Sequence, residues 1–440
     1  MPSGPAAPER TAAVRLVACG AVLTACVAAW AVLGDLTARV PVHLALYAVA
    51  FAAYLAALRG ARGVSARGLR LALAAAAAWR LALAFAPPLL SDDVFRSVWE
   101  GRVQVHGHNP YEWRNRPESD RLAHLRDEVW QRVNHKEYTA IYPPLWQLAA
   151  RGVIAAHDSV TAMKLFLVGC ELVALAALGA LLRRRGQPRE RVLVMAWSPL
   201  AIVEIAGSGH NDVFAIVFLV LALLWLDDGR PLLSALAAAL GAQAKMLPGL
   251  VAASWARRYR LVHVLGALLV VLALFLPYRW AGPGLWMSLG KYGQFWRFNE
   301  SVFALLDTLT GSHEHAVRLG LVLLGLLALA LAKKRVEATT AGLAVVAAWL
   351  LLTPNVLPSY AVWLLPWLVL RDAPALLLFT ATVQLAYLVY PAWLVGAPWK
   401  VGWGIRAFEY LPCLALAAAG AARARWAWAR LDLPAWHRTS

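Results

Sequence analysis

Long apolar segments alternate with short charged loops along most of the chain. Runs such as 13–33, 41–58 and 161–182 contain about 20 mostly apolar residues, which is the length that an α-helix needs to cross a bilayer. The strands of a membrane β-barrel would instead alternate apolar and polar residues over about 10 positions. The Leu/Ala-rich stretch 69–90 does not alternate, so the pattern predicts an all-α, polytopic membrane protein.

Several apolar segments are interrupted by polar or proline-containing tips. We expect a hairpin formed by 192–206 and 213–226 around the tip GSGHND, and two short helices within 231–256 around AKMLP. The prediction is one transmembrane domain over 1–422 with about 11–14 crossings, followed by a basic tail over 423–440. The remaining crossings are expected at 70–90, 261–277, 317–332, 338–353, 359–371, 374–392 and 405–422, with a short segment near the interface at 146–158.

The basic loops predict the orientation. RGARGVSARGLR (59–70), RRRGQPRER (183–191), KKR (333–335) and the tail are rich in arginine and lysine, and such loops stay in the cytoplasm. Both termini are then cytoplasmic, and 91–143 and 278–316 are extracytoplasmic. The first of these outer segments holds nine acidic and eight basic residues and lacks the positive bias of the inner loops.

Composition narrows the class further. The chain is 61% hydrophobic with a net charge of +17, but the positive charges lie in loops between apolar runs, which indicates membrane topology rather than nucleic-acid binding. Cys19, Cys26, Cys170 and Cys413 all lie inside apolar runs, which predicts small core residues and not a disulfide framework.

With this orientation, the polar tips of the apolar segments fall on one side. They include SDD, YPP (142–144), HND, AKMLP, KYGQFWRFN (291–299) and TPN. A transporter would place polar groups around the bilayer midplane on repeated halves, and no internal duplication is present. The pattern favours an enzyme that works at the outer leaflet.

The stretch SDDVFRSVWEGRVQVHGHNPY (91–111) carries the densest chemistry. Asp92 and Asp93 follow an apolar helix, and either could simply cap the next helix. Asp93, Arg96 and Glu100 share one helical face, which also carries Trp99 and forms a plausible sugar-binding wall, although Arg96 and Glu100 could be only a surface pair. His106 and His108 have no further ligands at zinc-site spacing.

Other candidates lie at the later tips. His210, Asn211 and Asp212 stand at a membrane boundary, where ionisable groups are often functional, although Asp212 could only cap a helix. Lys245 lies between apolar segments and either snorkels or contacts a phosphate at a helix break. Lys291 and Arg297 could bind a phosphate, or their segment could be an aromatic interfacial belt.

These motifs resemble the GT-C superfamily of integral-membrane glycosyltransferases, most closely its bacterial polyprenyl-phosphate-mannose-dependent branch, which includes actinobacterial mannosyltransferases of lipoglycan assembly. The similarity extends over most of 13–422 and rests on DxxRxxWEGRVxxxGxNPY followed by YPP, HND and KxxP. No diagnostic acceptor motif is present.

The resemblance implies a GT-C fold with a large first outer loop of interfacial helices. It also implies inverting transfer of a sugar, most plausibly mannose, from a polyprenyl phosphate to a hydroxyl of a cell-envelope glycolipid or glycan. A carboxylate would act as general base, with Asp92 slightly preferred over Asp93. Lys245, Lys291 and Arg297 would bind the donor phosphate, and no cofactor or metal is expected. Sugar or acceptor contacts are expected from Arg96, Trp99, Glu100, His106, His108, Asn109, Tyr111, Tyr142, His210, Asn211, Asp212 and Asn355.

Alternative functions remain open at this point. The donor sugar could be arabinofuranose or glucose, and the acceptor could be a protein. A flippase for lipid-linked sugars would use a continuous polar groove through the bilayer instead of an outer cavity with Asp92 at its base.

Overall fold

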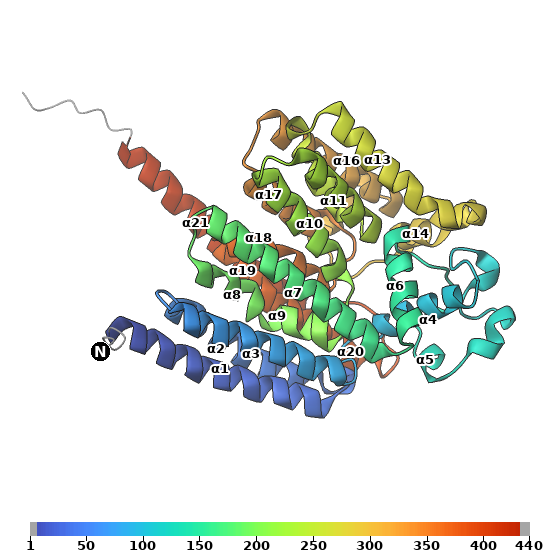
Figure 1. Cartoon of the computed structure of the whole chain (residues 1–440), viewed down its shortest axis with the longest axis horizontal. Coiled ribbons are helices and arrows are strands. Elements are labelled where there is room, and N and C mark those ends of the chain that lie inside the picture. The colour runs from blue at the N-terminus through green and yellow to red at the C-terminus, as the bar shows by residue number, and fades with distance from the viewer. Residues whose placement is uncertain (1–6, 432–440) are drawn as a thin grey trace, which may run out of the picture.

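The computed structural model describes residues 7–431, and they form a bundle of helices (Figure 1). Within these residues the only β-type pairing is an isolated bridge between Phe298 and Asn355. In the described part of the chain, eight helical segments are long and apolar enough to cross a membrane, which agrees with the predicted all-α polytopic class. They are Ala13–Leu33, Thr37–Gly60, Ala66–Phe85, Val160–Arg184, Leu261–Ala281, His313–Lys333, Pro374–Trp393 and Trp403–Ala422.

Three shorter apolar helices accompany these eight in the described part of the chain: Pro231–Ala244, Ala338–Leu352 and Pro358–Leu370. The expected 11–14 crossings included such short helices, and the exact number of crossings stays a prediction. The break expected near 244–248 is confirmed, because α11 (Pro231–Ala244) ends just before Lys245 and α12 (Leu247–Ala253) starts with Pro248 in its first turn.

Helices account for most of the described chain. The remaining helices are α1 (Ala7–Leu33), α2 (Val40–Gly60), α3 (Ala66–Phe85), α4 (Asp93–Val105), α5 (Glu128–Gln131), α6 (Pro144–Ala156), α7 (Val160–Arg184), α8 (Leu193–Ala196), α9 (Pro199–Ala201), α10 (Asp212–Asp227), α13 (Leu261–Phe275), α14 (Gly284–Phe295), α15 (Val302–Thr310), α16 (His313–Lys333), α17 (Ala338–Leu352), α18 (Leu365–Leu370), α19 (Pro374–Thr382), α20 (Val389–Trp393) and α21 (Trp403–Leu431).

Two expected boundaries are wrong. The third helix ends at Phe85 and not at 90, because Pro87 and Pro88 cannot continue it. The arm 192–206 is broken into α8, α9 and a π-helical turn over Ile202–Gly207, with Pro199 starting α9. The last apolar span ends at Ala422, and α21 continues beyond it to Leu431; residues 432–440 lie outside the described part.

Segment 91–143, which was predicted to be extracytoplasmic, folds over one end of the bundle, at the right of Figure 1. Its main helix, α4, packs against α6 and is buried within the protein from Val94 to Gln104. Gly101 permits this packing. A Cβ there would lie 2.7 Å from the Ala150 backbone oxygen, which is closer than a side chain tolerates.

The charged loops gather at the opposite end. Arg185 pairs with Asp227 at 2.6 Å, Arg191 pairs with Asp372 at 3.0 Å, and the Gly63 amide donates to Glu190. Loops distant in sequence therefore meet at one end of the bundle, as the predicted orientation requires of the basic loops.

Two buried polar contacts fix where the outer segment starts. Arg80 of α3 pairs with Glu171 of α7 at 2.6 Å, with both side chains fully buried. The Lys164 ammonium donates to the Leu83 and Ala86 carbonyls at 2.7 and 2.8 Å, so it satisfies the free carbonyls at the end of α3. These contacts hold the chain in place just before Asp92.

Candidate functional site

A cavity of about 740 Å³ opens at the end of the bundle covered by segment 91–143, within the usual size range of small-molecule sites. Five parts of the chain form its wall: 90–100, 131–142, 288–298, 355–360 and 387–399, with His210 and the Asp35 loop at its edges. Eight of the predicted site residues line it: Asp92, Asp93, Arg96, Glu100, Tyr142, His210, Arg297 and Asn355.

Asp92 and Asp93 share one amide. The Asn134 Nδ2 donates to Asp92 Oδ1 and to Asp93 Oδ1, both at 2.7 Å. Asp92 occupies the N-cap position of α4, but its side chain makes no capping hydrogen bond. The helix-cap interpretation of Asp92 is therefore wrong, and its carboxylate is directed at the cavity and at Asn134.

Arg96 holds the turn that carries Asn134. Its guanidinium donates to the carbonyls of 134, 135, 138 and 139 at 3.1, 2.9, 2.7 and 2.7 Å, and to Glu100 Oε1 at 2.9 Å. His135 in this turn has a φ of +46°, a conformation that is costly for a residue other than glycine. Every donor group of Arg96 is occupied, so Arg96 organises the turn that carries Asn134 from its place in the cavity wall.

The environment of Asp92 changes its acidity. Burial in the cavity wall and the neighbouring Asp93 carboxylate raise the pKa of Asp92, and the Asn134 amide opposes the rise. A carboxylate with a raised pKa is a stronger base than an ordinary aspartate, which suits general-base chemistry.

A chain of ionisable groups runs from Asp93 into the core. His210 Nδ1 lies 3.5 Å from Asp93 Oδ2, and His210 Nε2 lies 3.4 Å from Glu204 Oε2. Glu204 is fully buried and accepts hydrogen bonds from Gln384 at 2.9 Å and from Tyr387 at 2.9 Å. The imidazole therefore lies between two carboxylates. It contacts the Asp93 carboxylate and not that of Asp92, so His210 restrains only Asp93.

The predicted phosphate-binding cations differ in position. Arg297 lines the cavity but already pairs with Glu300 at 2.9 Å and Asp307 at 2.7 Å. Lys245 does not line the cavity. Its ammonium pairs with the Asp212 carboxylate at 2.7 Å and lies 5.3 Å from the centre of the Tyr142 ring.

Lys291 also lies outside the wall. Its ammonium stands 5.0 Å from the ring of Trp113 and 5.3 Å from that of Tyr138. Both contacts are of the cation–π type.

A scan against protein-family models places residues 9–259 in the family described as alpha-(1->6)-mannopyranosyltransferase, N-terminal domain. The match covers more than half of the chain and includes the two aspartates, Asn134 and His210. The chain belongs to this family. It is a GT-C membrane mannosyltransferase, as the sequence motifs indicated. Comparisons with curated proteins and with solved structures give no match.

Other predicted site residues of the mannosyltransferase lie away from the cavity. Trp99 is 1% exposed within the core, so its expected role as a sugar-binding wall is wrong, because α4 is buried on nearly all sides. Asp212 bonds to Lys245 and to the Trp363 indole at 2.6 Å. The others that do not line the cavity are His106, His108, Asn109, Tyr111 and Asn211.

The turn after α4 has a structural role in the mannosyltransferase. Asn109 Oδ1 accepts from the Tyr111 amide at 3.1 Å, and the Tyr111 hydroxyl donates to the Tyr142 carbonyl at 2.6 Å. The NPY motif thus ties the turn after α4 to the end of segment 91–143 and supports Tyr142 in the cavity wall.

Sequence reasoning missed several wall residues. Asn134 and Arg132 lie in a polar stretch without a recognisable motif. The Arg132 guanidinium pairs with the Asp35 carboxylate at 3.1 Å and stacks on the ring of Phe95. Glu204 had a usable signal, because an acid inside an apolar run is a functional candidate by default. Tyr390, Trp393 and Trp399 form an aromatic cluster on one wall, with ring centroids 5.0 to 6.2 Å apart.

No group of three or more metal-ligating side chains occurs among the residues that the structure describes. Independence from a metal stays a prediction.

Proposed function

We propose that the protein transfers mannose from a polyprenyl-phosphate donor to a hydroxyl of a cell-envelope glycolipid or glycan, with inversion at the anomeric carbon. The observation that carries this proposal is the carboxylate pair Asp92 and Asp93, held by Asn134 at the base of a cavity. The cavity is large enough for a sugar, and its wall carries both cations and exposed aromatic rings. Family membership makes mannose the best-supported sugar, ahead of arabinofuranose or glucose.

Asp92 is the proposed general base. The acceptor hydroxyl attacks the anomeric carbon and gives its proton to Asp92, while the bond from that carbon to the phosphate oxygen breaks. Asp92 suits this role because its carboxylate faces the cavity and its pKa is raised. Asp93 has the supporting role, since His210 restrains it from the far side. General-base catalysis of this kind contributes about 10²–10⁴ in rate.

The leaving phosphate needs positive charge. Arg132 and Arg297 are the proposed partners, because both line the cavity and their side chains are 42% and 38% exposed. Each now pairs with carboxylates, so a phosphate would compete for, or share, the guanidinium. A planar guanidinium binds phosphate oxygens in pairs, and such charge stabilisation is a major part of catalysis.

The proposed site faces the extracytoplasmic side. The arginine-rich loops meet at the other end of the bundle, and such loops are retained in the cytoplasm. A cavity at the outer end also argues against the flippase, which would keep polar groups along a path through the bilayer. A protein acceptor is less well supported than a glycan, given the family description.

The test is transfer by purified protein from synthetic β-mannosyl phosphoryl polyprenol to a mannose oligosaccharide acceptor, with the linkage determined by NMR. The proposal expects an α-(1→6) product from the lipid donor and none from a nucleotide sugar. Equal transfer from a nucleotide-linked mannose, or a product that keeps the β configuration, would refute the donor or the inverting mechanism.

A further inference from the structure

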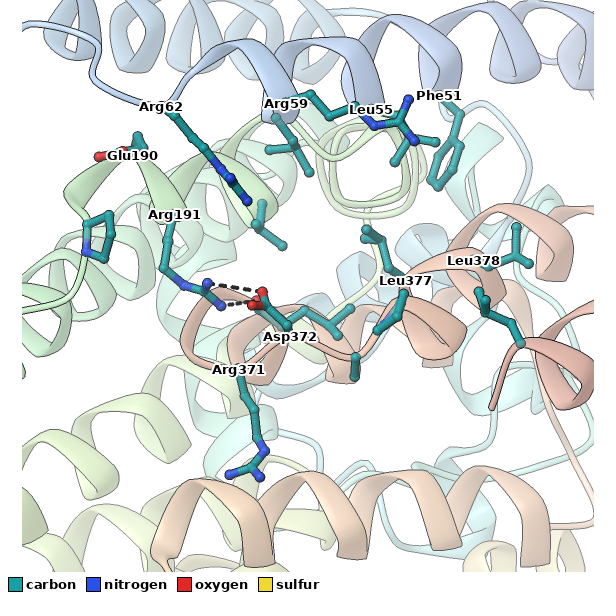
Figure 2. A pocket seen from close by; sticks show the side chains of 17 residues that line it. Phe51, Leu55, Arg59, Arg62, Glu190, Arg191, Arg371, Asp372, Leu377 and Leu378 are labelled. Carbon is teal, nitrogen blue, oxygen red and sulfur yellow. Dashed lines mark hydrogen bonds and ion pairs between the residues drawn. The ribbon is translucent and has the colours of Figure 1, made fainter. Parts of the chain in front are cut away.

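A second cavity, of about 920 Å³, lies at the opposite end of the bundle. It is formed by α2 and the loop after it, by the loop from Pro188 to Arg191, and by the region from Leu368 to Leu378, with Leu416 of α21 completing it. Figure 2 shows Arg59 and Arg62 on one side of this cavity and the pair Arg191 and Asp372 on the other. None of these residues takes part in the mannosyl-transfer site.

The mouth of this cavity is positively charged. Four arginines line it, against the two acids Glu190 and Asp372. Arg191 is paired with Asp372 at 3.0 Å. The side chains of Arg59 and Arg62 are exposed and have no ion-pair or hydrogen-bond partner among residues 13–422, whose side chains the structure describes. Two guanidinium groups therefore face the cavity mouth with their charge uncompensated.

The walls below the charges are apolar. Phe51, Leu55 and Leu58 recur at helical spacing on one face of α2, and Leu377 and Leu378 of α19 face them (Figure 2). An inorganic phosphate or a nucleotide has no hydrocarbon chain that would pack against such apolar walls. A ligand with a phosphate at one end and a hydrocarbon chain at the other satisfies both parts of the cavity.

We propose that this cavity binds an anionic phospholipid of the leaflet that contains the basic loops. Arg59 and Arg62 bind the phosphate headgroup, and one acyl chain lies between α2 and α19. The position agrees with the charge, because basic pockets between helices on the cytoplasmic side recognise anionic headgroups. The inference does not depend on the proposed transfer reaction, since binding is measured without donor or acceptor.

The experiment is native mass spectrometry of the full-length protein in detergent. The protein is mixed with phosphatidylglycerol or phosphatidylcholine at equal concentration, and the lipid that stays bound after release from the detergent is measured. Wild type is expected to retain one phosphatidylglycerol in preference to phosphatidylcholine. The double variant Arg59→Ala/Arg62→Ala is expected to lose about thirtyfold in phosphatidylglycerol affinity, which corresponds to the usual contribution of two basic residues at an anionic membrane surface.

A matched control removes the same charge from the start of α3, a few residues along the chain. Arg67 and Arg70 are exposed arginines of 59–70 that do not line the cavity, so Arg67→Ala/Arg70→Ala should bind like wild type. A third variant, Leu55→Trp, fills the apolar part without changing charge and should also weaken lipid retention. Inorganic phosphate at millimolar concentration should not displace the lipid.

Each contrary outcome overturns the proposal. Equal loss in the two double variants would mean diffuse attraction to charge, and equal retention of phosphatidylcholine would mean no headgroup recognition. Displacement by inorganic phosphate would mean a simple anion site. Monodisperse gel filtration of each variant excludes misfolding as the cause of a loss.

Discussion

Replacing Arg96 should destabilise the mannosyltransferase and inactivate it together. Arg96 is only 11% exposed in its side chain, and Glu100 is 4% exposed, so Arg96→Ala leaves a buried carboxylate with Gln147 as its remaining side-chain partner. Breaking a buried ion pair from one side costs about 3–5 kcal/mol. The carbonyls from 134 to 139 lose their donor at the same time, so the strained turn that carries Asn134 relaxes.

Arg96→Lys sharpens this prediction. An ammonium keeps the charge but cannot span Glu100 and four carbonyls, and each hydrogen bond to a charged group that is lost costs about 1.5–3 kcal/mol. The three donors of an ammonium leave at least two of the five hydrogen bonds of Arg96 unmade. For Arg96→Lys we therefore expect a loss of about 3–6 kcal/mol in the free energy of unfolding, measured by denaturant titration in detergent, and a large loss of kcat. Arg114→Ala is the control, because Arg114 is 65% exposed in its pair with Glu112 and such pairs contribute about 0–1 kcal/mol.

The result that would refute this reasoning is simple to recognise. If Arg96→Ala unfolds at the same denaturant concentration as Arg114→Ala, then the Arg96 network does not hold the outer segment. If Arg96→Lys keeps full activity, then the turn that carries Asn134 is positioned by other contacts.

Two further changes test the same region. Gly101→Ala should lower the free energy of unfolding by about 1–3 kcal/mol, the usual penalty of overpacking, because its Cβ would lie 2.7 Å from the Ala150 oxygen. Gly152→Ala on the facing helix is the control, because a Cβ there meets nothing within 4 Å. Equal melting temperatures of the two variants would contradict the prediction. Asn134→Ala removes the hydrogen bond that lowers the pKa of Asp92. Because the base must be unprotonated, activity is lost as the pH falls through this pKa, so the acid limb of kcat/KM should move to higher pH than in wild type; an unchanged or lower position would exclude Asp92 as the titrating group.

The parts of the site set by local sequence were predictable. Arg96 and Glu100 pair because residues four apart share a helical face, and the break before Lys245 follows from Pro248. The two aspartates stood out because they follow directly after a long apolar run.

The parts set by tertiary packing were not predictable. Asn134 reaches the aspartates from about 40 positions along the chain, through a loop without periodicity. Lys245 was expected either to snorkel or to contact a phosphate, but its ammonium pairs with Asp212, which lies on the preceding helix. Trp99 was expected on the same helical face as Arg96 and Glu100, which line the cavity, but its own side chain is 1% exposed within the core. Helical spacing alone therefore did not decide its exposure.

The most direct test of the central claim compares Asp92→Asn with Asp93→Asn in transfer from synthetic polyprenyl-phosphate mannose. Asp120→Asn is the control, because the Asp120 side chain is 99% exposed and lies outside the cavity. We expect Asp92→Asn to lose about 100-fold or more in kcat with little change in KM, as removal of a general base requires, while Asp120→Asn stays at the wild-type rate. Full activity of Asp92→Asn would contradict the account, and a selective loss in Asp93→Asn would move the base to Asp93.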